Sequence, residues 1–200
     1  MVGYCIDNFH SLSHNVTSFH TDMNLVFERI KSASHPQLHA LLPFYVEAFP
    51  LEERRDTSSL LRMLNEADMF FSAILVDDTV VGLVVYWKFG KFLYIEHLAV
   101  FPSQRRKGIG KSVLKKLQAE ANPILLEVEI PFDEASTRRV AFYQCSGFTA
   151  LQVYYQQPPY RKGESVVPMM LYSDLADWDT EVLNSSIEQF QLNVYYRKAD

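Results

Sequence analysis

The chain has 200 residues, of which 48% are hydrophobic and 22% charged, and its net charge is −5 at pH 7. This composition predicts one globular domain and excludes a disordered chain, a coiled-coil rod and a collagen-like repeat. No apolar run approaches the roughly 20 residues of a membrane span, so no membrane partner is expected. The acidic balance argues against a nucleic-acid partner. Two cysteines cannot form a disulfide framework, which favours a reducing, cytoplasmic location.

Residues 1–22 show neither alternation nor helical periodicity. They are predicted to be a loosely ordered extension, with a single domain over residues 23–200. A secretion signal is not expected, because no basic stretch precedes an apolar one. His10, His14 and His20 lack cysteine or carboxylate neighbours at ligand spacings, so no metal site is expected.

The domain shows two kinds of hydrophobic pattern. Apolar runs and alternation predict strands over residues 24–31, 69–76, 80–89, 92–101, 124–130, 148–156 and 166–172. A 3.6-residue period predicts helices over residues 34–49, 57–67, 108–121, 136–146 and 178–196. Within them, Thr57 is the expected N-cap of the second helix, and Val182, Leu183, Ile187, Phe190 and Val194 form the apolar stripe of the last.

Short polar connections at residues 77–79 and 90–91 predict antiparallel hairpins. The fold class is therefore α/β (α+β), with a mixed, largely antiparallel sheet flanked by helices. The apolar stripe of the helix at 178–196 must be covered, either by the sheet or by a second copy in a homodimer.

The segment LYIEHLAVFPSQRRKGIG, residues 93–110, carries the clearest chemical signal. A strand and a Pro turn lead to a basic triplet and two glycines that open an amphipathic helix. The first N–H groups of a helix lack internal partners, and its dipole adds positive charge there. Glycines let a bulky phosphate approach the backbone, so an anion site is predicted at this helix start.

Two nucleotide motifs fit this segment poorly. A P-loop ending in Gly110-Lys111-Ser112 would need glycine at position 105, which is Arg105. The dinucleotide fingerprint would need glycine at position 113, which is Val113.

The segment Arg105-Arg106-Lys107-Gly108-Ile109-Gly110 instead resembles the R/Q-x-x-G-x-G/A pyrophosphate loop of the GCN5-related N-acetyltransferase (GNAT) superfamily. Residues 95–102 resemble that family's fourth strand, and Tyr143 followed by Gly147-Phe148 resembles its late-helix pattern. The similarity covers roughly residues 24–172. It implies that acetyl-CoA lies in a gap where strands 92–101 and 124–130 splay apart.

The resemblance also implies residue roles. Backbone groups of Leu98 and Val100 would pair with pantetheine, the Leu98 N–H would stabilise the oxyanion, and Tyr143 would protonate the departing thiolate. Ser136 and Arg139 stand where the family often has an asparagine and a small residue; they would offer one hydrogen bond and one cation to the cofactor. The full expected cofactor set is Leu98, Ala99, Val100, Arg105, Arg106, Lys107, Gly108, Ile109, Gly110, Lys111, Ser136 and Arg139.

Glu96 is a carboxylate inside an apolar strand, and strict alternation places it on the same face as Leu98. It is the candidate base that removes a proton from an amine acceptor; the alternative is a structural pairing with a cation. His97 is expected on the opposite face as a packed core histidine, unless a bulge redirects it.

The function that follows is an acetyl-CoA-dependent N-acetyltransferase without a metal. It would transfer the acetyl group directly, in a ternary complex, to a primary amine of a small molecule, or else of a peptide or protein. The alternative is a non-catalytic acyl-CoA-binding or regulatory module. Acceptor selection is expected from the first helix, at residues 34–49 and kinked by Pro43, and from the loops at residues 49–55 and 156–165. An acidic cluster of Glu47, Glu52 and Glu53 is either an attractor for a cationic amine or a solvated face.

Overall fold

The computed structural model describes residues 23–120 and 123–197, and it contains a central eight-stranded sheet. Its strands are β1 (Leu25–Arg29), β2 (Met69–Val76), β3 (Thr79–Lys88), β4 (Leu93–Val100), β5 (Ile124–Glu129), β6 (Thr149–Ala150), β7 (Gln156–Gln157) and β8 (Val167–Ser173). The spatial order is β1-β2-β3-β4-β5-β8-β6, and β7 pairs with β8. The α-helices are α1 (Leu38–Ala48), α2 (Thr57–Met63), α3 (Ile109–Glu120), α4 (Glu134–Gln144) and α5 (Thr180–Val194).

Strands β1 to β4 form an antiparallel run, in which β2 and β3 are joined by the predicted hairpin. Asp77 and Asp78 in its turn both have positive φ, of 48° and 61°, which a tight two-residue hairpin turn requires. The pairing of β4 with β5 is parallel, whereas β5 and β6 pair with β8 antiparallel. The predicted mixed, largely antiparallel sheet is confirmed.

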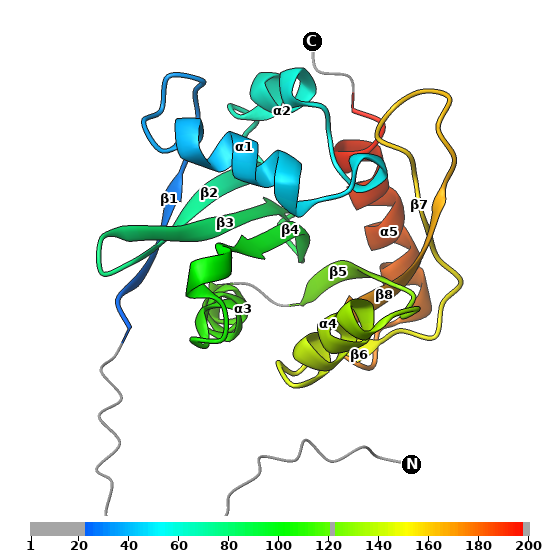
Figure 1. The fold of residues 1–200 in the computed structure, drawn as a ribbon. Helices are drawn as coiled ribbons and strands as arrows, with labels where there is room; N and C mark the ends of the chain where they lie inside the picture. The colour runs from blue at the N-terminus through cyan, green and yellow to red at the C-terminus, as the bar shows by residue number, and fades with distance from the viewer. Residues whose placement is uncertain (1–22, 121–122, 198–200) are drawn as a thin grey trace, which may run out of the picture.

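The sheet separates two hydrophobic cores (Figure 1). Helices α1, α2 and α5 bury Tyr45, Leu60 and Phe190 on one face. On the other face α3 buries Val113 and Leu117, and α4 packs beside it. The two faces are called the α1/α5 face and the α3/α4 face below.

The last helix covers the sheet of its own chain. Leu183, Phe190 and Val194 are buried on the α1/α5 face, while Val182 of the predicted stripe is 49% exposed. Ser186 replaces it on the buried side. Most of the predicted apolar stripe is therefore covered within the chain. Among the described residues, no helix is both long and apolar enough to cross a membrane.

Several local predictions differ from the structure; α2 ends at Met63 and not at residue 67, and α4 begins at Glu134 and not at residue 136. The N-cap of α2 is Asp56, whose carboxylate accepts from the Ser59 N–H at 2.9 Å, and not Thr57. Helix α1 begins at Leu38, four residues after the predicted start at residue 34. The predicted strand at 148–156 is wrong in extent, because only Thr149–Ala150 pairs before the chain leaves the sheet. The predicted extension at residues 1–22, with its three histidines, lies outside the described residues.

Candidate active site

Strands β4 and β5 pair over only three residues and then separate. Leu93–Ile95 faces Ile124–Leu126, and no further pairing follows toward Val100 and Glu129. A cavity of about 370 Å³ opens at the point of separation. We call it the interstrand cavity; it is lined by Ala48, Phe49, Pro50, Glu53, Glu96, His97, Leu98, Ala99, Val100, Arg105, Glu127, Val128, Glu129, Arg139, Tyr143, Gln157 and Met169.

A β-bulge in β4 determines which side chains face this cavity. His97 pairs with Val85 and Ile95 pairs with Tyr86, so Glu96 is an extra residue without a partner on β3. Glu96 and His97 consequently lie on the same α1/α5 face, where Glu96 contacts Trp87 and His97 contacts Tyr45. Leu98 packs on the α3/α4 face. The predicted burial of His97 is confirmed, but the prediction that it faces away from Glu96 is wrong, and so is the shared face of Glu96 and Leu98.

The cavity therefore passes between the strands from one face of the sheet to the other. Its α1/α5 side presents Glu96, His97 and Glu127, and its α3/α4 side presents Leu98 and Tyr143. A donor and an acceptor can thus approach the gap from opposite faces.

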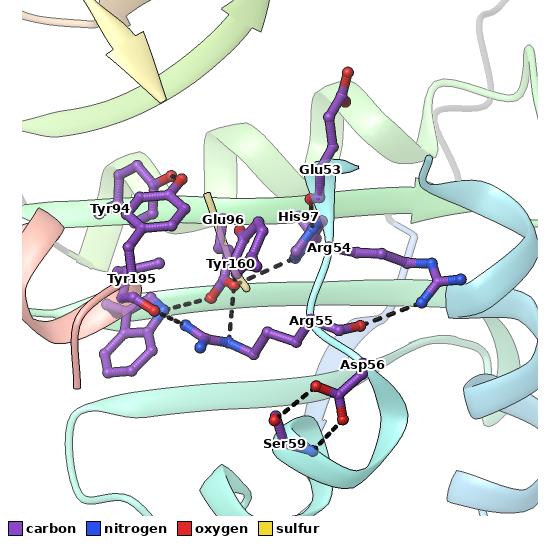
Figure 2. Close-up of polar contacts among 12 residues, drawn as sticks. Glu53, Arg54, Arg55, Asp56, Ser59, Tyr94, Glu96, His97, Tyr160 and Tyr195 are labelled. Atoms are coloured by element: carbon purple, nitrogen blue, oxygen red, sulfur yellow. Dashed lines mark hydrogen bonds and ion pairs between the residues drawn. The ribbon is translucent and has the colours of Figure 1, made fainter. Parts of the chain in front are cut away.

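Glu96 is held by a buried cation and two neutral donors (Figure 2). The Arg55 Nε lies 3.2 Å from Glu96 Oε1, and the two side chains are 6% and 1% exposed. Tyr160 donates its hydroxyl to Oε1 at 3.0 Å, and Trp87 donates its indole N–H to Oε2 at 2.6 Å. Arg55 also donates to the Val194 carbonyl at the end of α5.

The buried environment of His97 favours the neutral form of its ring. Its Nε2 lies 3.0 Å from the Glu53 carbonyl, to which it donates, and its Nδ1 lies 3.8 Å from Glu96 Oε1. Burial lowers the pKa of His97 below its usual value, against the opposing effect of Glu96. Tyr45 and Phe49 pack against the ring edge-on.

Glu127, on β5, is a second carboxylate of the same cavity. Tyr155 donates to its Oε1, and Tyr195, the C-cap of α5, donates to its Oε2 at 2.6 Å. Burial raises the pKa of Glu127 to about 7, although the phenol hydrogen bonds oppose this rise. Our sequence reasoning did not single out Glu127. The signal was present, because Glu127 is a carboxylate inside an apolar strand, as Glu96 is.

A second hollow, of about 530 Å³, lies on the α3/α4 face beside the start of α3. We call it the loop groove. It is lined by Leu98, Val100, Gln104, Arg105, Arg106, Gly108, Ile109, Gly110, Lys111, Ala135, Arg138, Arg139, Phe142 and Tyr143.

The backbone of the loop groove suits a bulky anion. Arg106 and Gly108 have positive φ, of 64° and 79°, so the chain turns sharply before α3 and exposes its first N–H groups. A Cβ on Gly110 would lie 3.1 Å from the Phe142 ring, so a larger residue there would have to push this ring aside. Several cations line the groove, so the residues fit the diphosphate of a coenzyme A thioester.

Most of the expected cofactor residues are brought together by this arrangement. Leu98, Val100, Arg105, Arg106, Gly108, Ile109, Gly110, Lys111 and Arg139 line the loop groove, and Ala99 lines the interstrand cavity. Lys107 lies outside both linings and donates to Gln104 at 2.9 Å.

Ser136 lies outside both linings as well. Its hydroxyl is buried in a capping box with Asp133 at the start of α4, where it donates to the Asp133 carboxylate at 2.6 Å. Arg139 of α4 forms an ion pair with Glu129 at the end of β5, and both residues line the interstrand cavity.

Tyr143 lines both the interstrand cavity and the loop groove. Burial raises the pKa of its phenol to about 12, with Arg139 acting in the opposite direction, so Tyr143 holds its proton at neutral pH. Tyr143 is thus a protonated phenol at the place where the two hollows meet.

The loops at 49–55 and 156–165, expected to select the acceptor, contact each other. Arg161 donates to the carbonyls of Leu51 and Arg54 at 2.5 and 2.9 Å, and Gln157 donates to the Glu52 carbonyl at 3.3 Å. Glu53 lines the interstrand cavity, whereas Glu47 and Glu52 do not. Within the described residues, no group of three or more His, Cys, Asp or Glu side chains is arranged to hold a metal ion.

Comparison with known proteins identifies the family of this chain. A sequence model described as the acetyltransferase (GNAT) family matches residues 36–148. A GNAT-family acetyltransferase candidate from Bacteroides thetaiotaomicron is 34% identical, covers 86% of this chain and 99% of its own, and superposes with a TM-score of 0.78. YjbC, an acetyltransferase candidate of Bacillus subtilis (strain 168), is 26% identical over 72% of this chain and 76% of its own length.

A third relative shares the fold. Arabidopsis thaliana Naa50, solved with the bisubstrate analogue CoA-Ac-MVNAL, is 19% identical with a TM-score of 0.53, over 74% of this chain and 97% of its own. Because the family model spans more than half of the residues and the Bacteroides thetaiotaomicron protein aligns with most of them, this chain belongs to the acetyltransferase (GNAT) family.

Proposed function

We propose that the protein transfers the acetyl group of acetyl-CoA to a primary amine of a small molecule, directly within a ternary complex. The observation that carries this proposal is the meeting of the two hollows. The loop groove and the interstrand cavity share Leu98, Val100, Arg105, Arg139 and Tyr143 as lining residues.

The donor side of the proposal rests on the loop groove and on the free edge of β4. The groove offers cations and unpaired helix N–H groups to the diphosphate. Beyond Ile95, β4 has no pairing on its β5 side, so an extended pantetheine arm can lie along that edge. The acetyl group then lies beside Leu98 and Tyr143, where the loop groove meets the interstrand cavity.

The acceptor side rests on the size and charge of the interstrand cavity. At about 370 Å³ it lies at the small end of ligand pockets, which favours a compact acceptor. The contacting loops at 49–55 and 156–165 narrow access from the α1/α5 face. Glu53 and Glu127 place carboxyl groups on this side, which in their ionised form attract an ammonium group.

The residues then have the following roles. The amine nitrogen loses a proton to a carboxylate of the cavity and attacks the thioester carbon. The Leu98 N–H stabilises the oxyanion, and Tyr143 gives its proton to the leaving sulfur. Glu96 is held in place by Arg55 and Tyr160 and forms part of the cavity wall beside the acceptor.

A screen with purified protein tests this function. Acetyl-CoA is supplied with polyamines, aminosugars, amino acids, aminoglycosides or lysine peptides, and free CoA and N-acetylated product are measured by mass spectrometry. At least one small amine should be acetylated at a rate that rises with its concentration. The chain has two cysteines, of which Cys145 is exposed, so a colourimetric thiol readout needs a control with protein and acetyl-CoA but no amine. Tight CoA binding without acetylation of any amine would contradict the proposal and favour a non-catalytic acyl-CoA-binding module.

A further inference from the structure

We propose that Glu127, and not Glu96, takes the proton from the acceptor ammonium, and that Tyr155 and Tyr195 are positioning residues that hold the Glu127 carboxylate. This inference rests on the proposed acetylation of an amine. It extends the active site to α5, which lies outside residues 36–148 matched to the family.

The partners of the two carboxylates favour Glu127. Both residues line the interstrand cavity and both are partly exposed. Glu96 is paired with a buried cation, Arg55, whereas the hydrogen bonds that Glu127 accepts come from the neutral phenols of Tyr155 and Tyr195. An adjacent cation favours the ionised form of a carboxylate and makes it a weaker base.

The number of free lone pairs favours Glu127 as well. A carboxylate offers about four lone-pair sites. Glu96 Oε1 already faces Arg55 and Tyr160, and its Oε2 accepts from Trp87. Glu127 accepts two phenol hydrogen bonds, one on each oxygen, against the three polar partners of Glu96, so Glu127 keeps more of its lone-pair sites for the ammonium proton.

The phenols around Glu127 form a connected buried network. Tyr195 donates to Glu127 and lies 3.0 Å, hydroxyl to hydroxyl, from Tyr94. Gln191 of α5 donates its amide to the Tyr155 hydroxyl at 3.4 Å. Two donors that converge on one carboxylate from different segments fix its position.

The protonation of Glu127 suits a base that works near neutral pH. Burial raises its pKa to about 7, its phenol partners lower it, and the nearby negative charge of Glu96 raises it. The titratable groups that face it are Tyr94 and Glu96 from β4, Tyr155 and Tyr160 from the segment around β7, Tyr195 from the end of α5, and Glu129 from its own strand.

The protons balance as follows. The Glu127 carboxylate takes one proton from the ammonium, and the neutral nitrogen forms the N–C bond to the acetyl carbon. The C–S bond breaks, and the thiolate takes the proton of Tyr143. The second proton of the nitrogen restores Tyr143, and the proton on Glu127 passes to solvent.

The test compares pH profiles of kcat/KM for an acetylated amine. Glu127→Gln should lower kcat/KM by about 10²-fold or more and remove the acidic limb of the profile. Its affinity for acetyl-CoA should stay unchanged. Tyr195→Phe removes a donor to the ionised carboxylate, so the acidic limb should move upward by roughly one pH unit with folding intact. Tyr196→Phe, at the exposed neighbouring phenol, is the matched control and should leave the profile unchanged.

A second readout needs no acceptor. Infrared spectra titrated with pH should show a carboxyl group with a midpoint of about 7 in the wild type that is missing in Glu127→Gln. If Glu127→Gln does not fold, Tyr195→Phe is the test: an acidic limb that stays at its wild-type pH in this variant would contradict the inference.

Wild-type rates for Glu127→Gln at every pH, or loss of the acidic limb in Glu96→Gln alone, would overturn the inference while leaving the acetyltransferase function intact. A wild-type protein that acetylates no amine would overturn the proposed function itself.

Discussion

Arg55 is the buried cation beside Glu96, and replacing it with methionine should strongly destabilise the fold. The pair is separated by 3.2 Å, with side chains 6% and 1% exposed, so water cannot replace the lost guanidinium. Leaving one member of such a pair buried and uncompensated costs about 3–5 kcal/mol. The substitution also removes the hydrogen bond from Arg55 to the Val194 carbonyl.

Urea unfolding followed by circular dichroism measures this loss. With a slope of about 2 kcal/mol per M urea, the midpoint should fall by roughly 1.5–2.5 M. Arg54→Met is the matched control, because Arg54 is partly exposed and, among the described residues, its guanidinium donates to the Phe49 and Arg55 carbonyls and to no carboxylate. Arg54→Met should lower the free energy of unfolding by about 1 kcal/mol or less.

A double variant separates charge from packing. Arg55→Met combined with Glu96→Gln should be more stable than Arg55→Met alone, because the stranded negative charge is gone. If Arg55→Met costs no more than Arg54→Met, or if the second substitution only adds to the loss, the two buried charges do not stabilise each other and the reasoning fails.

Three further predictions concern the site. Tyr143→Phe should lower kcat by about 10²-fold or more while acetyl-CoA affinity, measured by calorimetry, is kept; unchanged turnover would exclude Tyr143 as the acid. Gly110→Val should weaken acetyl-CoA binding, because its Cβ meets the Phe142 ring at 3.1 Å, and Phe142→Ala should restore part of the affinity. Glu127 has a pKa of about 7 in the folded protein against 4.5 in an unfolded chain, so the folded state binds more protons between these values. The free energy of unfolding should therefore fall as pH rises through this window, by up to about 3 kcal/mol, and Glu127→Gln should flatten that decline.

Local pattern was enough to predict most of the fold. Apolar runs separated by short polar turns identified β2, β3 and β4, and the left-handed Asp77 and Asp78 are residues that tolerate the hairpin turn. Element ends were less predictable. Asp56 and Thr57 are both good caps, and only the Asp56 contact with Ser59 decides between them.

The site was only partly predictable, because its decisive contacts are long-range. Strict alternation along β4 cannot reveal the extra residue at Glu96, since a bulge depends on pairing with β3. Nothing local distinguishes Arg55 from Arg54; the difference is contact with Glu96 and Val194. Glu96 was predicted because it is a carboxylate inside an apolar strand. The same argument applies to Glu127, which was not predicted.

The contact of Arg55 with α5 has a consequence for the kinetics of folding. Its guanidinium joins a loop near the start of the domain to a carbonyl 139 residues later, and to β4 between them. Closing so long a loop is slow and entropically costly. The contacts of Arg55 with Val194 and Glu96 should therefore form after the rate-limiting transition state of folding. Replacing Arg55 should then mainly raise the unfolding rate and leave the refolding rate nearly unchanged. Arg55 therefore contributes to the kinetic stability of the native state.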